Sequence, residues 1–483
     1  MSKMVLAIDI GASSGRSIIG SLDNEKITIK EIDRFSNGPN KINEVLYWDF
    51  SKLLSHIKKS ITKAEKYGKL NSLAIDTWGV DFGLIDKDGN MINQPVHYRD
   101  KRTMGMIDLV TKIVSKKEIF SQTGIQFMEL NTLYQLFSIM RNDSFDYKNS
   151  ERLLFSPDLL SYMLTGNMVA ERSIASTSQI YNPFKKTWSY NLINALKINE
   201  KLFPNIVDSG TIVGNYNNVS VIAGCGHDTA CAFAATPVKE NKKSAILSSG
   251  TWSLLGCELS QPIINDAVLK NEFTNEVGAN DTIRFLKNLN GLWIVQELRR
   301  FWNEQNISYT FDDLVKMANK SKPFQYFINP SDESFFSPGD MAERIKAFCK
   351  KTGQKTPSSH DEIIRSAFEG LAFLYADTFS SLENLTNFNF EQIHIVGGGC
   401  QNKLLNQMTA NAVGIPVITG PVEATAIGNI LIQLITLGEI PNLIEGRKII
   451  EASFNNEMEI IYPKSHQLWK EALKKWKILS RSI

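Results

Sequence analysis

Residues Val5 to Leu22 have the sequence VLAIDIGASSGRSIIGSL, whose pattern is the main indication of the fold class. Two apolar runs, VLAIDI and SIIGSL, flank the short polar turn GASSGR, and this pattern predicts two strands joined as a hairpin. A similar stretch, AILSSGTWSLLG, recurs at Ala245 to Gly256. Two hairpins with polar turns, one in each half of the chain, predict two related α/β domains.

The segments that follow each hairpin support this duplication. The first half is expected to contain a helix over Phe50 to Ala64, strands over Ser72 to Thr77 and Val80 to Ile85, and a strand followed by a helix over Val219 to Ala235. The second half is expected to contain a helix over Glu362 to Leu385, strands over Ile393 to Val396 and Ile415 to Thr419, and a helix over Thr425 to Leu437. Both halves therefore predict alternating strands and helices after the hairpin.

A break in apolar periodicity separates the halves at Thr236 to Lys243, TPVKENKK, where proline and charge take over. A chain of 483 residues is also too long for one core of ordinary size. We therefore expect an N-terminal domain over residues 1–238 and a C-terminal domain over residues 239–483.

Composition excludes several classes of protein. Lys and Arg together number 53 against 51 Asp and Glu, so no strong field favours a nucleic acid or an anionic membrane as a partner. The five cysteines are odd in number and none forms a Cys-x-x-Cys motif, which favours a reduced, cytoplasmic protein. The apolar runs Met4 to Ile8 and Ile427 to Leu437 are too short for a signal peptide and a membrane span.

Asp9 and the turn Gly11 to Arg16 form the first candidate site. Small residues let backbone amides approach phosphate oxygens, and a carboxylate on the preceding strand can hold Mg²⁺ through its waters. An ordinary tight hairpin explains the same residues equally well. The turn also matches Gly-x-Ser-x-Gly of esterases, but that site needs a helix after the serine, and the run Ser17 to Ile19 favours a strand.

Asp228 lies in the second candidate site, Gly224 to Ala230, with the sequence GCGHDTA. An apolar strand precedes it and a helix of small residues is expected to follow. Ligands of open α/β sheets bind at such strand ends, and a carboxylate there can accept the proton of a hydroxyl that attacks phosphorus. The alternative is that Asp228 only caps the helix.

Three successive glycines form the third candidate site, within IHIVGGGCQN at Ile393 to Asn402. A strand that ends in glycines allows a flat ligand such as adenine or ribose to lie on bare backbone. The alternative is a plain strand-to-helix turn. The sequence contains neither a P-loop nor the His-Arg-Asp and Asp-Phe-Gly motifs of protein kinases, and no histidine pair has metal-ligand spacing.

Taken in order, the motifs resemble the FGGY carbohydrate kinases of the actin-like ATPase superfamily, and among them the rhamnulokinases. Besides the first hairpin, the motifs that carry this resemblance are IDTWGVDFGLID (Ile75 to Asp86), HYRDKRT (His97 to Thr103), GHDTA (Gly226 to Ala230), SSGTWSLLG (Ser248 to Gly256), RFLKNLNGLWIVQELRR (Arg284 to Arg300), VGGGCQNKLLNQ (Val396 to Gln407) and GPVEATAIGN (Gly420 to Asn429). They run in register over nearly the whole chain.

This resemblance implies a fold of two RNase-H-like domains with an active-site cleft between them, and a role for each matching residue. Asp228 matches the catalytic base, and Asp9 the magnesium-linked carboxylate. The residues that match ATP contacts are Ala12, Ser13, Ser14, Gly15, Arg16, Thr251, Gln296 and Gly398. The residues that match sugar contacts are Gly79, His227, Asp228, Thr229 and Asn288.

The implied activity is transfer of phosphate from ATP to the C1 hydroxyl of L-rhamnulose, with Mg²⁺, by a monomer or small homo-oligomer. The chain departs from the family at Val277-Gly278, where two glycines are usual, and at Asn290, where an apolar or small residue is usual. Alternative activities are phosphorylation of another ketose, such as L-fuculose or L-xylulose, and the ATPase activity of an actin-like protein that is not a kinase.

Overall fold

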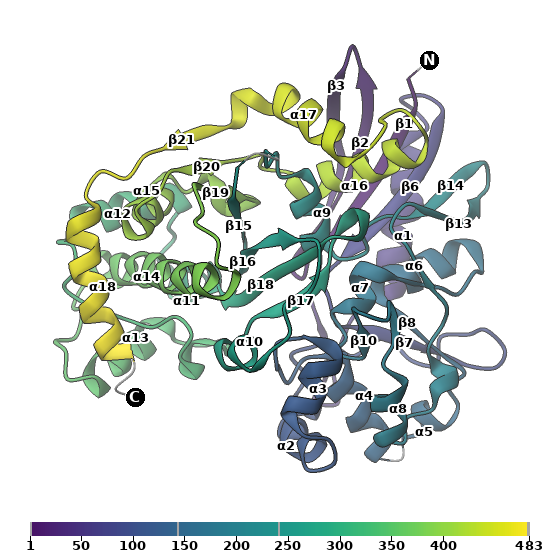
Figure 1. The fold of residues 1–483 in the computed structure, drawn as a ribbon, viewed down its shortest axis with the longest axis horizontal. Coiled ribbons are helices and arrows are strands. Elements are labelled where there is room, and N and C mark those ends of the chain that lie inside the picture. The colour runs from purple at the N-terminus through teal and green to yellow at the C-terminus, as the bar shows by residue number, and fades with distance from the viewer. Residues whose placement is uncertain (1, 143, 240–241, 481–483) are drawn as a thin grey trace. The chain divides into compact units, whose positions relative to one another are not determined.

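The computed structural model describes residues 2–142, 144–239 and 242–480, and the chain forms two compact units (Figure 1). Unit 1 contains the chain up to Pro237, together with Glu258–Phe285 and Ala424–Asn455. Unit 2 contains Val238–Cys257, Leu286–Glu423 and the chain from Asn456 onward. None of the helices in the described ranges is both long enough and apolar enough to cross a lipid bilayer.

Unit 1 is built on a six-stranded sheet in the order β13-β14-β6-β1-β2-β3. These strands are β1 (Met4–Ile10), β2 (Ser14–Asp23), β3 (Lys26–Ser36), β6 (Leu70–Thr77), β13 (Thr211–Tyr216) and β14 (Val219–Ala223). Strand β1 pairs antiparallel with β2 and parallel with β6, and β6 pairs parallel with β14. The predicted first hairpin is therefore confirmed, and the strand that follows its turn leaves no place for the helix of an esterase site.

The remaining elements of unit 1 pack against this sheet or around a second apolar core that includes residues of β7, β8, α4 and α8. Its helices are α1 (Phe50–Ala64), α2 (Met106–Thr111), α3 (Lys116–Thr123), α4 (Thr132–Arg141), α5 (Phe145–Lys148), α6 (Ser156–Thr165), α7 (Arg172–Ser176), α8 (Tyr190–Ala195), α9 (Asp228–Ala235), α10 (Asp266–Asn271), α16 (Ala424–Thr436) and α17 (Leu443–Phe454). Its short strands are β4 (Asn40–Ile42), β5 (Val45–Tyr47), β7 (Phe82–Ile85), β8 (Arg152–Phe155), β9 (Ala170–Glu171), β10 (Tyr181–Asn182), β11 (Thr187–Trp188), β12 (Ile206–Val207) and β17 (Thr274–Val277).

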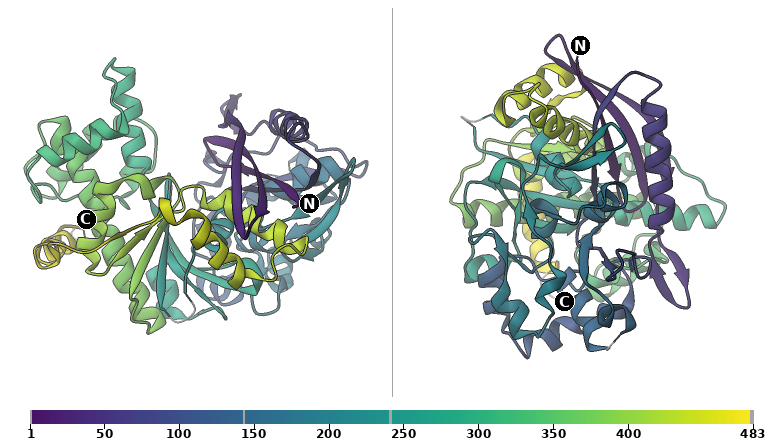
Figure 2. Two further views of the ribbon diagram at one scale, coloured as in Figure 1. Left: turned by 90° about the horizontal axis from the view of Figure 1, so that it is seen from above. Right: turned by 90° about the vertical axis from the view of Figure 1, so that its right-hand side faces the viewer.

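The six-stranded sheet is covered by apolar side chains on both faces of strand β1. Every residue of this strand after Met4 is buried, as expected for a strand covered on both sides. Helix α1 turns the apolar stripe that contains Leu53 and Ile57 toward the sheet, and Asp49 caps it by accepting a hydrogen bond from the Lys52 amide. The right-hand view of Figure 2 shows α1 and α16 on opposite sides of the first strands.

Helix α16 belongs to unit 1 although it lies far along the chain. Its Gln433 accepts a hydrogen bond from the Ser72 hydroxyl on β6 and donates one to the Leu6 carbonyl on β1. Gly428 lets α16 approach α9 closely, because a Cβ atom there would lie 1.9 Å from the Cys231 carbonyl oxygen. These contacts hold the predicted second-half helix on the first sheet.

The observed units therefore differ from the expected division into residues 1–238 and 239–483. The first crossing does fall between Pro237 and Val238. Residues 258–285 and 424–455 then return to unit 1, because their buried side chains pack there. Two residues of the predicted linker, Glu240 and Asn241, lie outside the described residues.

The second sheet has the order β17-β18-β16-β15-β19-β20-β21, and unit 2 is built on β15, β19, β20, β21 and most of β16 and β18. Its strands are β15 (Ser244–Ser249), β16 (Trp252–Leu259), β18 (Ile283–Asn290), β19 (Gln392–Val396), β20 (Val417–Thr419) and β21 (Glu459–Ile461). Its helices are α11 (Trp293–Glu304), α12 (Phe311–Lys320), α13 (Met341–Lys351), α14 (His360–Thr386), α15 (Lys403–Val413) and α18 (His466–Ser480). Strand β15 pairs antiparallel with β16 and parallel with β19, which repeats the arrangement of β1, β2 and β6.

Candidate active site

Asp228 is the first residue of α9, and a loop of four residues separates it from the end of β14 at Ala223. Its Oδ1 accepts hydrogen bonds from the Thr229 amide at 2.6 Å and the Thr229 hydroxyl at 3.1 Å. The His227 Nε2 lies 3.3 Å from the same oxygen. Two residues, Thr229 and His227, thus place three groups at one carboxylate oxygen, and the side chain remains 29% exposed.

Burial raises the pKa of Asp228 above its ordinary value, and the negative charge of Asp9 adds to this effect. The neighbouring His227 and the Thr229 hydrogen bonds lower the pKa and so oppose that rise. A carboxylate with a raised pKa is a stronger base than an exposed aspartate, which suits it to accept a proton.

The loop before Asp228 is held by a buried carboxylate that the sequence analysis missed. Glu171, at the end of β9, accepts a hydrogen bond from the Gly226 amide at 2.8 Å and others from Ser173 and Ser209. The Ser173 hydroxyl in turn accepts a hydrogen bond from the His227 amide at 3.2 Å. Glu171 and Ser173 therefore fix the backbone that presents His227 and Asp228.

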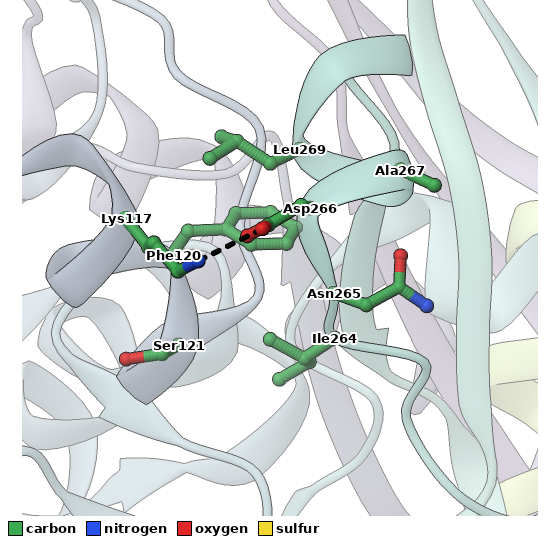
Figure 3. Close-up of a pocket in the computed structure, with 8 residues that line it drawn as sticks. All are labelled: Lys117, Phe120, Ser121, Ile264, Asn265, Asp266, Ala267 and Leu269. Atoms are coloured by element: carbon green, nitrogen blue, oxygen red, sulfur yellow. Dashed lines mark hydrogen bonds and ion pairs between the residues drawn. The ribbon is translucent and has the colours of Figure 1, made fainter.

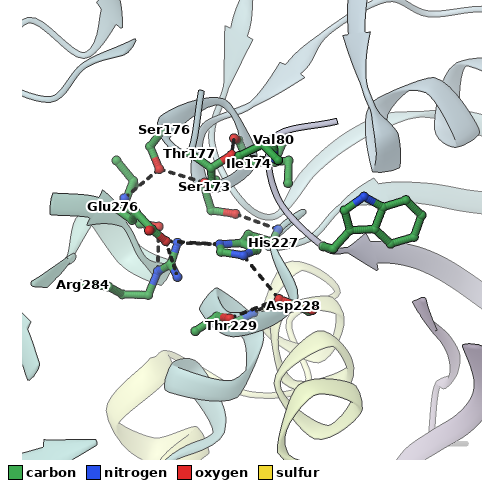
Figure 4. Close-up of polar contacts among 12 residues, drawn as sticks. Val80, Ser173, Ile174, Ser176, Thr177, His227, Asp228, Thr229, Glu276 and Arg284 are labelled. Atoms are coloured by element: carbon green, nitrogen blue, oxygen red, sulfur yellow. Dashed lines mark hydrogen bonds and ion pairs between the residues drawn. The ribbon is translucent and has the colours of Figure 1, made fainter. Parts of the chain in front are cut away.

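The His227 ring is the second link between this loop and the rest of unit 1 (Figure 4). Its Nδ1 lies 3.1 Å from Arg284 Nη2 and 3.3 Å from Glu276 Oε2. Arg284 Nη1 is 3.0 Å from Glu276 Oε2, so the two charged side chains form a buried ion pair. Figure 4 shows this pair on one side of the ring and Asp228 on the other.

The first hairpin turn presents its polar residues to solvent. Ser13 and Ser14 are exposed, and Ala12 is partly exposed. Gly15 is required at the base of the turn, since a Cβ atom there would lie 2.3 Å from the Phe35 ring. Exposed hydroxyls and amides above a rigid base are what a phosphate-binding turn requires.

Three carboxylates of unit 1 influence one another near this turn. Asp9 and Asp76 are direct neighbours on the paired strands β1 and β6. Burial, and then the charges of Asp9 and Asp228, raise the pKa of Asp76 well above its ordinary value. Asn429 donates a hydrogen bond to Asp76 Oδ2 at 2.6 Å, and Arg16 pairs with Asp9 at 2.8 Å.

This concentration of acidic groups fits a nearby divalent cation. Asp76 Oδ1 is buried and has no hydrogen-bond partner in the described part of the chain. Within that part, no three His, Cys, Asp or Glu side chains are arranged to hold a metal directly. Hydrated Mg²⁺, bound through water as this ion prefers, is compatible with both observations.

Gly79 lies in a tight turn after β6. A Cβ atom at Gly79 would approach the Thr177 side chain to 3.3 Å, and the Thr177 hydroxyl accepts a hydrogen bond from the Val80 amide. Below the turn, Asp81 accepts hydrogen bonds from the indole nitrogens of Trp48 and Trp78. The predicted sugar contact therefore lies on a backbone held from two sides.

Unit 2 brings together two of the predicted ATP contacts. The Thr251 hydroxyl, in the β15–β16 turn, donates a hydrogen bond to Gln296 Oε1 on α11 at 3.1 Å. Asn288 is half-buried on β18. The unusual Asn290 on the same strand donates to the Pro330 carbonyl at 3.0 Å, so its amide serves the packing of unit 2.

The three glycines of the triplet differ in whether the local structure requires a glycine. Gly397 has a φ of +81°, and a Cβ atom at Gly399 would lie 2.0 Å from the Ser249 hydroxyl oxygen. A Cβ atom at Gly398 would meet open space. Local structure thus explains the outer two glycines but not the middle one, which is the predicted ATP contact.

The second departure from the family pattern, Val277, is accommodated within unit 1. Val277 is buried with Tyr181 and Ile283, and its amide donates a hydrogen bond to Ser176. Arg284 Nε donates to the Val277 carbonyl at 3.1 Å. The larger side chain therefore fills an apolar cluster next to the Glu276–Arg284 pair.

Sequence reasoning did not identify Glu171, Asp76, Glu276 or Arg284 as site residues. Arg284 does carry a signal, because a lone arginine in the apolar run IRFL of a buried strand requires a partner. Glu171 and Glu276 carry none, because the loop residues that they hold, Gly226 and His227, are distant in the sequence.

A surface cavity of unit 1 does not coincide with this site (Figure 3). It has a volume of about 520 Å³ and lies between α3 and the segment that leads into α10, with Lys117 and Asp266 paired at 2.8 Å. None of the predicted site residues lines it. The hydrogen bonding around Asp228, rather than this cavity, identifies the candidate active site.

Known proteins similar to this chain include curated rhamnulokinases. The chain is 40% identical to rhamnulokinase of Ligilactobacillus salivarius over 464 residues, 94% of each protein. It is 39% identical to rhamnulokinase of Bacteroides thetaiotaomicron over 483 residues, 98% of each, and 39% identical to that of Bacillus subtilis over 93% of each.

Solved structures share the fold at much lower identity. Gluconate kinase from Lactobacillus acidophilus has a TM-score of 0.80 at 14% identity, covering 100% of this chain and 98% of that one. Glycerol kinase from Plasmodium falciparum has a TM-score of 0.78 at 14% identity, with coverage of 100% and 98%. The N-terminal domain of the FGGY family of carbohydrate kinases matches residues 4–235, and the C-terminal domain matches residues 245–437. The chain belongs to the FGGY family of carbohydrate kinases.

Proposed function

We propose that this enzyme transfers the γ-phosphoryl group of ATP to the C1 hydroxyl of L-rhamnulose, giving L-rhamnulose 1-phosphate and ADP in the catabolism of L-rhamnose. The observation that carries the chemistry is the environment of Asp228, whose Oδ1 is held by Thr229 and His227 while the side chain remains partly exposed. The similarity to rhamnulokinases over nearly the full length supports the choice of sugar.

Asp228 is the general base in this proposal. Its Oδ2 accepts the proton of the C1 hydroxyl as the sugar oxygen bonds to the γ-phosphorus and the bond to the bridging oxygen of ADP breaks. Phosphoryl transfer needs little covalent help from a protein, so alignment of the two substrates supplies most of the rate. The fixed loop around Gly226 contributes that alignment by holding Asp228 still.

The remaining predicted residues bind the two substrates. Gly79, His227, Thr229 and Asn288 would contact the sugar. Those that would contact ATP are Ala12, Ser13, Ser14, Gly15, Arg16, Thr251, Gln296 and Gly398. The exposed turn hydroxyls, the Thr251–Gln296 hydrogen bond and the open space at Gly398 support these assignments.

Magnesium would be held through water by Asp9, with Asp76 beside it. When bound, the ion would neutralise negative charge on the phosphates. Replacing Asp9 with asparagine should raise the Mg²⁺ concentration needed for half-maximal activity and leave sugar affinity unchanged. A magnesium titration with calorimetry of the sugar tests this, and an unchanged titration would remove Asp9 from the metal site.

The choice of sugar is tested by an ADP-release assay with L-rhamnulose, L-fuculose and L-xylulose at matched concentrations. We expect L-rhamnulose to give the highest kcat/KM. A higher value with another ketose would reassign the substrate within the family. Equal ADP release with and without sugar would instead indicate an ATPase that is not a sugar kinase. No disulfide joins any of the five cysteines, which all lie in the described part of the chain and are buried, and this supports an enzyme that acts in the reducing cytoplasm.

A further inference from the structure

The ion pair between Glu276 and Arg284 lies next to His227 without contacting Asp228. The Arg284 side chain is fully buried, and that of Glu276 is only 5% exposed. A buried ion pair gives little net stability, because the loss of hydration offsets most of the attraction. Because stability alone does not explain why both charges are buried here, a role of the pair toward His227 is the better explanation.

The chemistry of arginine determines what the pair does to the His227 ring. A guanidinium donates hydrogen bonds and cannot accept them. Arg284 Nη2, 3.1 Å from His227 Nδ1, therefore requires Nδ1 to be the acceptor. The ring proton of neutral His227 is then on Nε2, which lies 3.3 Å from Asp228 Oδ1 and can donate to it.

Glu276 offers the opposite arrangement. Its Oε2 lies 3.3 Å from the same Nδ1 and could accept a proton from it. A neutral ring protonated at Nδ1 would turn the bare lone pair of Nε2 toward the Asp228 carboxylate, which is repulsive. Arg284 prevents this by donating to Nδ1 itself, and the charge of its guanidinium, with Nη1 3.0 Å from Glu276 Oε2, draws that oxygen into an ion pair.

We propose that Glu276 and Arg284 are positioning residues for phosphoryl transfer. Arg284 fixes the Nε2–H form of His227, and His227 holds Oδ1 of Asp228, which leaves Oδ2 for the acceptor hydroxyl. Glu276 orients and neutralises Arg284. This inference rests on the proposed role of Asp228 as the base, and it adds two residues that do not touch the substrate.

The proton on His227 can be observed directly in the ligand-free full-length enzyme. Nitrogen NMR of ¹⁵N-histidine-labelled protein distinguishes protonated from unprotonated ring nitrogens, and the spectrum of His227→Gln assigns the signal among six histidines. We expect an unprotonated Nδ1 and a protonated Nε2. In Arg284→Met, which removes the donor to Nδ1, the proton should move to Nδ1. A protonated Nδ1 in the unmodified enzyme would overturn the proposal.

Kinetics separate positioning from support of the fold. The double variant Glu276→Met with Arg284→Met removes both charges and leaves neither one buried alone. We expect kcat with L-rhamnulose and ATP to fall by about 10–100-fold, as for other groups that orient a catalytic residue, with both KM values nearly unchanged. The control is Arg365→Met with Glu369→Met, which removes a buried pair of unit 2 and should keep kcat.

Two kinetic results would refute the inference. One is a kcat of the double variant equal to that of the unmodified enzyme. The other is a parallel loss of kcat, sugar affinity and melting temperature, which would mean that the pair only supports β17 through the Val277 carbonyl. If the unmodified enzyme does not phosphorylate L-rhamnulose, the proposed function fails, whereas the NMR result still decides the role of Arg284.

Discussion

The groups that contact the Asp228 carboxylate all lie at one of its two oxygens, Oδ1. This asymmetry fits a general base better than a helix cap. An aspartate that only caps a helix bonds backbone amides of the next turn. Asp228 instead bonds Thr229, directly after it, and faces His227. At the scale of the residue, its surroundings fit proton transfer better than they fit capping.

Replacing Asp228 with asparagine should lower kcat by at least ~10², because asparagine cannot accept the hydroxyl proton. ATP affinity should persist. The control is Asp266→Asn, which changes an exposed aspartate at the same position of helix α10. ADP release at saturating sugar measures both variants. Equal, near-normal kcat values would show that Asp228 is not the general base.

Gly398 gives a second test at the scale of the residue. Because a Cβ atom there meets open space, Gly398→Ala should leave the melting temperature unchanged. If adenosine lies on this backbone, the added methyl group should weaken ATP binding by at least ~10-fold. In contrast, Gly399→Ala would collide with Ser249 and should lower the melting temperature. Unchanged ATP affinity in Gly398→Ala would remove the middle glycine from the nucleotide site.

At the scale of elements, Asp81 joins three segments of unit 1. It accepts hydrogen bonds from Trp48 just before α1, from Trp78 after β6 and from Gln135 on α4. Burial raises its pKa to about 6, against the effect of these donors. Asp81 therefore fixes the turn that presents Gly79. Burying its charged form lowers the stability of the folded protein by an amount that depends on pH.

The raised pKa of Asp81 predicts that its contribution to the free energy of unfolding depends on pH. A folded-state pKa above the unfolded value means that this group's contribution is greatest at low pH and is lost as pH rises through about 6. Asp81→Asn removes this contribution. The destabilisation caused by Asp81→Asn should thus be larger at about pH 5 than at about pH 7.5, by roughly 1.4 kcal/mol.

Urea unfolding of both proteins at the two pH values measures this difference. The exposed Asp88, in the turn after β7, provides the control variant Asp88→Asn, whose effect should not change with pH. A destabilisation by Asp81→Asn that is equal at both pH values would show that Asp81 titrates like an exposed aspartate.

At the scale of the whole molecule, the proposed ligand contacts are divided between the units. Gly79 and His227 belong to unit 1, whereas Asn288, Thr251 and Gly398 belong to unit 2. A ligand that contacts both units favours the arrangement in which both sets of contacts form. The second ligand then binds to an arrangement that the first has already selected.

Sugar and nucleotide should therefore strengthen each other's binding. We expect a nonhydrolysable ATP analogue to tighten the binding of L-rhamnulose by ~1–3 kcal/mol, and the sugar to tighten analogue binding by the same amount. Calorimetry of each ligand with and without the other measures both effects. Unequal effects would indicate a third linked process, and affinities independent of the partner ligand would show that the two sites are not coupled.

Local sequence determined the two hairpins, the amphipathic helix α1 and the strand–loop–helix that carries Asp228. Each depends on residues close together in the chain, whose spacing and turn chemistry suffice to predict them. The same reasoning found the three glycines and the turn at Ser13 and Ser14. The assignment of roles among them came from resemblance to the family.

The packing of α16 on the first sheet and the contacts of Glu276 and Arg284 with His227 Nδ1 became visible in the folded structure alone. Asn429 reaches Asp76 across 353 residues of chain, and Arg284 reaches His227 across 57. Periodicity and turn chemistry describe neighbours in sequence, whereas burial pairs a polar group with whatever donor or acceptor the fold brings near. Tertiary packing therefore determines which groups pair with the buried charges. It also determines how the proposed catalytic base, Asp228, is oriented.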